Sequence, residues 1–124
     1  MREALVGLII QLRLGPEFGP DDGMDDREAL IEALRDCLGD ETSTDSGSRS
    51  TNIKYWDLPP ERWEEALRSA VEQVQALGLA ERALIARVDY VDKGPNDYEW
   101  GPRRVVWPLD RVGPFNLFPE YPEF

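Results

Sequence analysis

The stretch Pro60–Val91 constrains the fold more than any other part of the chain, because it combines an amphipathic helix, a glycine stop and a strand. The apolar stripe of the helix consists of Trp63, Ala66, Leu67, Ala70, Val71, Val74 and Leu77. Gly78 follows this stripe, where a left-handed C-terminal cap is favourable. Leu84–Val91 then alternates as a strand with one strongly apolar face does. A helix that leads directly into a strand is half of an α/β unit, so the remaining segments must supply its partners.

The rest of the chain predicts one more helix and three more strands. Ala4–Leu14 alternates over its whole length and ends at a Gly-Pro pair, which is typical of a central strand. Asp25–Leu38 has helical spacing and is followed by glycine. Ser50–Trp56 and Tyr98–Trp107 have the alternation of strands, and a Gly-Pro interruption in the second favours an edge position or a bulge.

The predicted order of elements is β-α-β-α-β-β, which favours a two-layer α/β (α+β) sandwich. We expect two helices on one face of a four- to five-stranded mixed sheet. A ferredoxin-like arrangement, βαββαβ, needs one further strand between the helices, and Thr42–Trp56 is the segment that could hold it. Residues 1–110 are predicted to form a single domain, and residues 111–124 an extended tail.

The tail is rich in proline and in aromatic residues. Phe115, Phe118, Tyr121 and Phe124 recur every three residues, which is the period of polyproline II. Four aromatic rings on a free tail would be an aggregation hazard, so we expect the tail to be docked. Two alternatives are open: the tail packs on its own domain, or it enters a groove on a partner or on a second copy of the chain.

The first helix is predicted to begin with Asp25 as its N-cap, and Glu28 stands in the capping-box position. Its predicted buried stripe is Ala29, Leu30, Ile31, Leu34, Cys37 and Leu38. Cys37 is therefore interpreted as a core residue rather than as a nucleophile. A thiolate near the C-terminal end of a helix is disfavoured, and no histidine is available to activate it.

Composition excludes several classes of function. The chain has no histidine and a single cysteine, which removes serine and cysteine triads, a structural zinc site and an internal disulfide framework. No phosphate-binding glycine loop and no nucleophile elbow is present. The sequence therefore favours a chain without enzymatic activity, metal or cofactor. Cysteine usage, and the absence of an apolar run of membrane length, favour the cytoplasm of a bacterial cell and no membrane partner.

Acidity is concentrated in one region. The net charge is −11, and the segment from Glu17 to Asp45 contains eleven acids against Arg27 and Arg35, a local charge of −9. This pattern argues against direct binding to nucleic acid or to anionic membranes, whose phosphates need Lys and Arg. It permits a basic protein partner or a cation. The alternative interpretation is a solvated face that keeps the protein soluble.

The predicted partner-binding residues combine these acids with aromatic residues expected at the surface: Asp21, Asp22, Asp25, Asp26, Asp40, Glu41, Trp56, Trp100, Phe118 and Tyr121. In size, charge and lack of catalytic groups, the chain is similar to the small acidic immunity proteins that neutralise bacterial toxins. The resemblance implies an inhibitor whose acidic surface meets a basic toxin or nucleic-acid enzyme. The alternative is a small-molecule-binding or enzymatic domain with a pocket between sheet and tail. A homodimer through a sheet edge or the tail is also left open.

Overall fold

The computed structural model describes residues 3–39, 42–47 and 49–115. The regular elements are β1 (Glu3–Arg13), α1 (Asp25–Leu38), β2 (Ser43–Ser46), β3 (Ser50–Leu58), α2 (Trp63–Ala76), β4 (Ala83–Gly94), β5 (Asp97–Trp107) and β6 (Gly113–Pro114). Short 3-10 helices connect them: η1 (Pro16–Phe18), η2 (Pro60–Arg62), η3 (Ala80–Arg82) and η4 (Leu109–Arg111).

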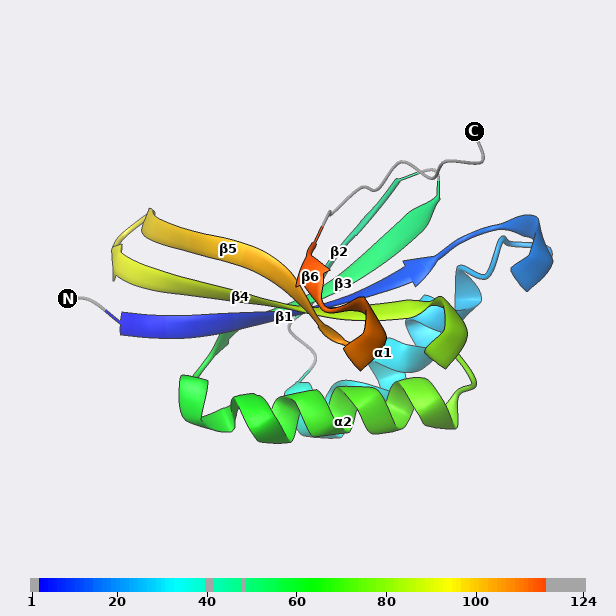
Figure 1. Ribbon diagram of the computed structural model, residues 1–124, viewed down its shortest axis with the longest axis horizontal. Helices are drawn as coiled ribbons and strands as arrows, with labels where there is room; N and C mark the ends of the chain where they lie inside the picture. Colours follow the sequence, from blue (N-terminus) through cyan, green and yellow to red (C-terminus); the bar gives the residue numbers. More distant parts are fainter. Residues whose placement is uncertain (1–2, 40–41, 48, 116–124) are drawn as a thin grey trace.

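Within these described residues, the strands form one six-stranded sheet in the order β2-β3-β1-β4-β5-β6, and both helices lie against the same face of it (Figure 1). The predicted α+β sandwich is confirmed. The predicted count of four to five strands is wrong, because the described residues form six. The predicted mixed sheet is also wrong, because all five pairings between these strands are antiparallel. The strand β2 explains the direction of β3, because it reverses the chain before β3 and makes β3 run antiparallel to β1. Its sequence, Ser-Thr-Asp-Ser, has no apolar residue and gives no strand signal.

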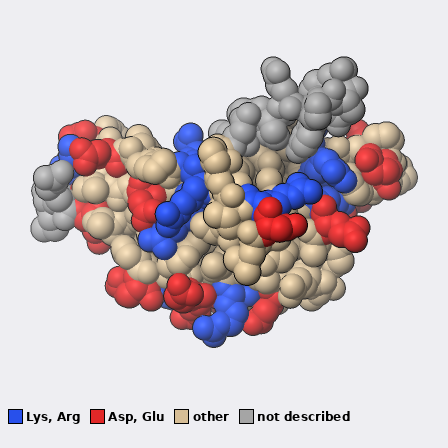
Figure 2. All heavy atoms as spheres, viewed as in Figure 1, with Lys and Arg blue, Asp and Glu red and all other residues tan. Residues whose placement is uncertain are grey.

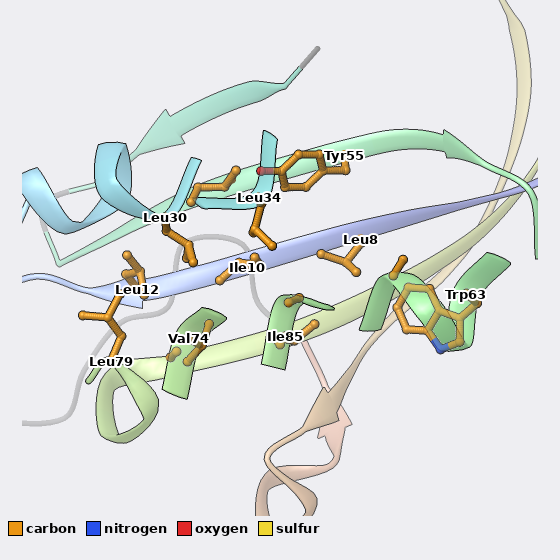
Figure 3. Close-up of a cluster of buried hydrophobic side chains, with 14 of the residues drawn as sticks. Leu8, Ile10, Leu12, Leu30, Leu34, Tyr55, Trp63, Val74, Leu79 and Ile85 are labelled. Carbon is orange, nitrogen blue, oxygen red and sulfur yellow. The ribbon is translucent and has the colours of Figure 1, made fainter. Parts of the chain in front are cut away.

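The main core lies between the helices and the sheet. Leu8, Ile10 and Leu12 from β1 and Ile85 from β4 meet Leu34 from α1, among others, and all five are fully buried (Figure 3). These strand residues are spaced by two and the helix residues by three or four, so each element presents one apolar side to the other. Among the described residues, no helix is long and apolar enough to cross a membrane.

The N-terminal cap and the buried stripe of α1 differ from their predictions. Met24, not Asp25, is the N-cap residue, and no side chain caps the helix from that position. Instead, Asp21 Oδ2 accepts a hydrogen bond from the Asp25 N–H at 2.7 Å. Cys37 is exposed, so its placement in the core is wrong. Leu30 and Leu34 are the fully buried residues of this helix, because α1 contacts the sheet along a narrower stripe than its spacing predicts.

The helix α2 is close to its prediction. Its buried residues are Trp63, Ala66, Ala70 and Val74. Pro60 begins a 3-10 turn rather than the α-helix itself. Gly78 has φ of 71° and ends the helix as expected, while Leu77, predicted to be buried, is 40% exposed. The strand that follows is longer than predicted and forms a hairpin with β5 that projects past the helices (Figure 1).

Candidate functional site

The face of the sheet that carries no helix has its own apolar cluster. Leu5, Ile9, Ala86, Val88 and Tyr90 are buried there, and Trp56 and Phe115 pack against them. These residues lie on β1 and β4 at the alternate positions to the main core, so the two inner strands are apolar on both faces. At the centre of the helix-free face, side chains of the sheet itself therefore cover one another without help from a helix.

A glycine in β1 makes room for one of these side chains. A Cβ atom built on Gly7 would lie 2.6 Å from Cζ3 of Trp56, which is far closer than real contacts allow. Gly7 therefore lets the indole of Trp56, which comes from β3, lie directly over the backbone of β1. This close approach brings Trp56 to the aromatic side chains of the β4–β5 hairpin.

Trp56, Tyr90, Tyr98 and Trp100 together form what we call the aromatic cluster. Tyr90, Tyr98 and Trp100 are in mutual contact: the Tyr90 and Trp100 centroids are 4.7 Å apart at 32°, those of Tyr98 and Trp100 are 5.5 Å apart at 33°, and those of Tyr90 and Tyr98 are 6.1 Å apart at 64°. Trp56 meets Trp100 edge-on, at 5.5 Å and 69°. Such offset and edge contacts are favourable arrangements of aromatic rings. Tyr98 is 44% exposed and Trp100 is 52% exposed, so the outer part of the cluster faces solvent.

A reciprocal hydrogen-bond pair fixes the inner ring. The Tyr90 hydroxyl donates to Asp57 Oδ1 at 2.6 Å, and the Asp57 N–H donates to the same hydroxyl oxygen at 2.6 Å. Asp57 has φ of 62°, which is unusual for a residue with a side chain. Desolvation, and after it the hydrogen bond to Asp57, raise the pKa of Tyr90 above its ordinary value. The pair holds a carboxylate beside the cluster.

Further carboxylates flank the cluster on the same face. Asp92 is the cross-strand partner of Tyr98 and also of Glu3 on β1, so these three residues form one row. No ion pair within the described part of the chain involves Glu3, Asp57 or Asp92. Figure 2 shows acidic side chains gathered over the β4–β5 hairpin, and Lys and Arg in a band across the middle of the view.

Residues 14–24, which connect β1 to α1 and which we call the acidic loop, lie at the end of the sheet opposite to the β4–β5 hairpin (Figure 1). Asp21 accepts hydrogen bonds from the backbone N–H groups of Gly23 and Asp25. Although partial desolvation opposes the shift, these bonds lower the pKa of Asp21. The pKa of Asp25 is raised, because it shares a hydrogen bond with Asp21 and lies in the field of that carboxylate. Asp22 is exposed.

Arg82 ties this loop to the sheet. The side chain is 6% exposed and donates to Asp26 Oδ2 at 2.6 Å, to the Gly23 carbonyl at 2.9 Å and to the Arg13 carbonyl at 3.1 Å. Its guanidinium also lies over the ring of Phe18, 4.2 Å from the centroid. Asp26 therefore has a structural partner, as Asp21 does.

The structure thus separates the predicted partner-binding residues into two groups. Trp56 and Trp100 lie together in the aromatic cluster, while Asp21 and Asp22 lie in the acidic loop and Asp25 and Asp26 lie in the first turn of α1, which follows it. Leu5 and Arg13 mark the two ends on β1, and the eight residue-to-residue steps from one to the other span about 26 Å. Asp40, Glu41, Phe118 and Tyr121 lie outside the described residues.

A pocket of about 600 Å³ opens at the acidic-loop end, where β5 stops short of the beginning of β4. Its apolar lining includes Leu84, Val105 and Phe115. Its charged lining is Arg13, Glu81, Arg82, Asp110 and Arg111. Phe115 belongs to the predicted tail, and its N–H donates to the carbonyl of Arg103 at 3.2 Å.

Sequence reasoning missed Tyr90, Tyr98 and Asp57 as members of one site. The alternation of Leu84–Val91 predicts only that Tyr90 lies on the apolar face of a strand, and nothing in the local pattern relates it to residues of β3. Gly7 is the signal that could have found the contact, because a glycine inside a central strand often marks close approach of another group.

Within residues 3–39, 42–47 and 49–115, no group of three or more Cys, Asp or Glu side chains is placed to hold a metal ion. No family model, no curated protein and no solved structure matches the chain. The geometry of the chain itself therefore carries the functional argument.

Proposed function

We propose that this chain is a non-enzymatic, acidic protein-binding domain that acts in the cytoplasm as an inhibitor or immunity protein and neutralises a basic partner such as a toxin or nuclease. The observation that carries the proposal is the aromatic cluster. It exposes Tyr98 and Trp100 on a sheet face without helices, beside carboxylates that have no ion pair within the described part of the chain.

The composition of this surface supports a protein partner. Trp and Tyr are the residues that most often dominate binding energy at protein interfaces, where they fill the centre of the contact. The net charge of −11 favours rapid encounter with a basic protein. The acidic loop, at the other end of the sheet, adds to this long-range field without touching the cluster.

The test is recovery of proteins from the native host on the immobilised chain, followed by reconstitution with each purified candidate. A matched bait carries Tyr98→Ser and Trp100→Ser. We expect a basic partner that the wild-type bait retains and the double variant loses, and whose association rate falls steeply as salt rises, because steering is screened beyond about 8–10 Å. A partner that is acidic, or that associates at the same rate in low and high salt, would contradict the proposal.

The pocket of about 600 Å³ favours a second candidate function, binding of a small molecule. This volume falls in the range of ligand sites, and its lining combines apolar and charged side chains. Thermal melting with a panel of small organic acids, bases and zwitterions tests this candidate. A ligand that raises Tm in the wild type but not in a Val105→Trp variant, which fills the pocket, would favour it over the protein-binding function.

We also propose that β1 to β4 with the two helices have the ferredoxin-like arrangement, extended by β5 and β6. The strand order β2-β3-β1-β4 and the βαββαβ succession support this assignment. Docking of residues 116–124, on the domain or on a second copy, stays a prediction. Light scattering of the full chain and of a chain ending at Phe115 tests the second alternative, since loss of a dimer on truncation would place the tail between copies.

A further inference from the structure

The exposed part of the aromatic cluster has the chemical character of a cation-binding site, which we call the cation seat. Trp100 is tilted by only 32° against Tyr90 and by 33° against Tyr98, and Trp100 and Tyr98 are 52% and 44% exposed. The face of an aromatic ring carries negative electrostatic potential and attracts ammonium and guanidinium groups, most strongly when the ring is an indole.

Carboxylates stand where they would meet the charge of such a group. Asp92 is in register with Tyr98, Glu3 is in register with Asp92, and Asp57 is fixed by Tyr90. An aromatic face alone binds an exposed cation weakly, and neighbouring carboxylates add attraction of the same sign. Together they favour a positive side chain over a neutral one of the same shape.

One cation flanks the cluster on its own face. Arg87 lies over the ring of Trp63 from α2, and Lys93, which pairs with Glu99 at 3.3 Å, alternates with Asp92 along β4, so both belong to the other face of the sheet. Arg103 is exposed and lies in register with Val88, on the side of the cluster away from Asp92. It repels a positive guest there, which leaves the side next to Asp92 and Glu3.

We propose that a lysine or arginine side chain of the protein partner lies on the exposed surface of Trp100 and Tyr98, with its charge next to Asp92 and Glu3. This inference rests on the proposed function, because it names the group of the basic partner that the surface recognises. Charge complementarity selects the occupant: the site is anionic and aromatic, and the partner group is cationic.

The test uses a capped peptide that contains three arginines separated by glycines, and a second peptide in which citrulline replaces each arginine. Citrulline keeps the shape of arginine and removes the charge. Binding is followed through the indole N–H signals of Trp56 and Trp100 in nitrogen–proton NMR spectra of the full chain. We expect the arginine peptide to shift the Trp100 signal. We expect the citrulline peptide to bind about 2- to 5-fold more weakly than the arginine peptide.

Variants locate the seat. We expect Trp100→Leu and Asp92→Asn each to weaken the arginine peptide about 2- to 5-fold, Trp100→Phe to weaken it less, and Arg103→Ser to strengthen it. Glu64→Gln is the matched control for Asp92→Asn, because it removes the same charge from an exposed position on α2 and should change nothing. Thermal melting of each variant checks that the fold is kept.

Equal binding of the two peptides, no shift at Trp100 at millimolar peptide, or equal effects of Asp92→Asn and Glu64→Gln would overturn the cation seat. The two proposals fail differently. A basic partner that binds the Trp100→Leu and Asp92→Asn variants as well as wild type would remove the seat and leave the proposed function. A Trp100 signal that responds to the arginine peptide in a chain that retains no basic protein would do the reverse.

Discussion

The two faces of the sheet are closed in different ways. On the face that carries the helices, aliphatic side chains from both layers meet at regular spacing, and the residues at its centre are fully buried (Figure 3). On the other face, a few aromatic side chains fold across neighbouring strands, and the outermost of them stay exposed. The first arrangement supplies most of the apolar burial of the fold, while the second leaves a surface that a partner can use.

The comparison predicts its largest effect on the helix-covered face. Leu34→Ala removes a fully buried side chain between α1 and the sheet, so we expect the free energy of unfolding to fall by about 2–5 kcal/mol. Urea denaturation followed by circular dichroism measures it. Ala33→Gly in the same helix is the control for backbone propensity and should cost about 1 kcal/mol. A loss at Leu34 no larger than at Ala33 would mean that this face is not the main core.

A smaller effect is expected on the helix-free face, where Gly7→Ala places a methyl group against the indole of Trp56. Overpacking of this kind costs about 1–3 kcal/mol. The indole must also move, so the near-ultraviolet circular dichroism of the cluster should change. In a Trp56→Leu background the cost of Gly7→Ala should shrink, because the clashing ring is gone. An unchanged cost in that background would show that Gly7 is needed for the strand rather than for the ring.

Leu34 and Trp56 also show how far the sequence predicts the structure. Leu34 follows from helical spacing alone, because an amphipathic helix must bury its apolar stripe somewhere. Trp56 is expected at the surface from the sequence, and it is half-buried instead. Its environment is made by Gly7, Tyr90 and Trp100, which belong to three other stretches of chain, and no local pattern encodes that meeting.

The same reasoning explains the missed strand and the misplaced cysteine. β2 is an edge strand of polar residues, so it is held by the backbone of β3 and by contacts such as the Lys54–Asp45 ion pair rather than by apolar burial. Cys37 has the spacing of a buried residue and is exposed, although Leu38 beside it packs against the main core, because only a narrow stripe of α1 is covered. Periodicity predicts the direction of the buried face of a helix and not its width.

The hydroxyl of Tyr55 can show whether water enters the core on the helix-covered face. Its hydroxyl is buried and has no hydrogen-bond partner among the described residues, and burial raises its pKa to about 12. Near neutral pH, Tyr55→Phe should therefore change the free energy of unfolding by less than about 1 kcal/mol, in the stabilising direction.

The difference between Tyr55→Phe and wild type should grow in alkali. The unfolded chain loses the tyrosine proton near pH 10 while the folded chain keeps it, so the wild type loses stability as pH rises from about 10 to 12. The Phe variant lacks this contribution and should become the more stable protein by up to ~2 kcal/mol. Urea denaturation at pH 8 and pH 11 measures the difference, and equal pH dependence of the two proteins would show that the hydroxyl is hydrated in the fold.

A smaller effect than that of Leu34→Ala is expected where the helix-free face meets solvent. Trp100→Ser should lower the free energy of unfolding by about 1–3 kcal/mol, because half of the side chain is already exposed and the loss is limited to its contacts with three other rings. If the proposed function holds, the same change should weaken the complex with a basic partner by about 2 kcal/mol or more, as loss of an interface tryptophan commonly does. Calorimetry of the complex beside urea denaturation of the free chain gives both numbers. Large stability with small binding effects would make the cluster a second core, because a residue kept for packing loses folding energy when it is truncated, whereas a residue kept for recognition loses mainly binding energy.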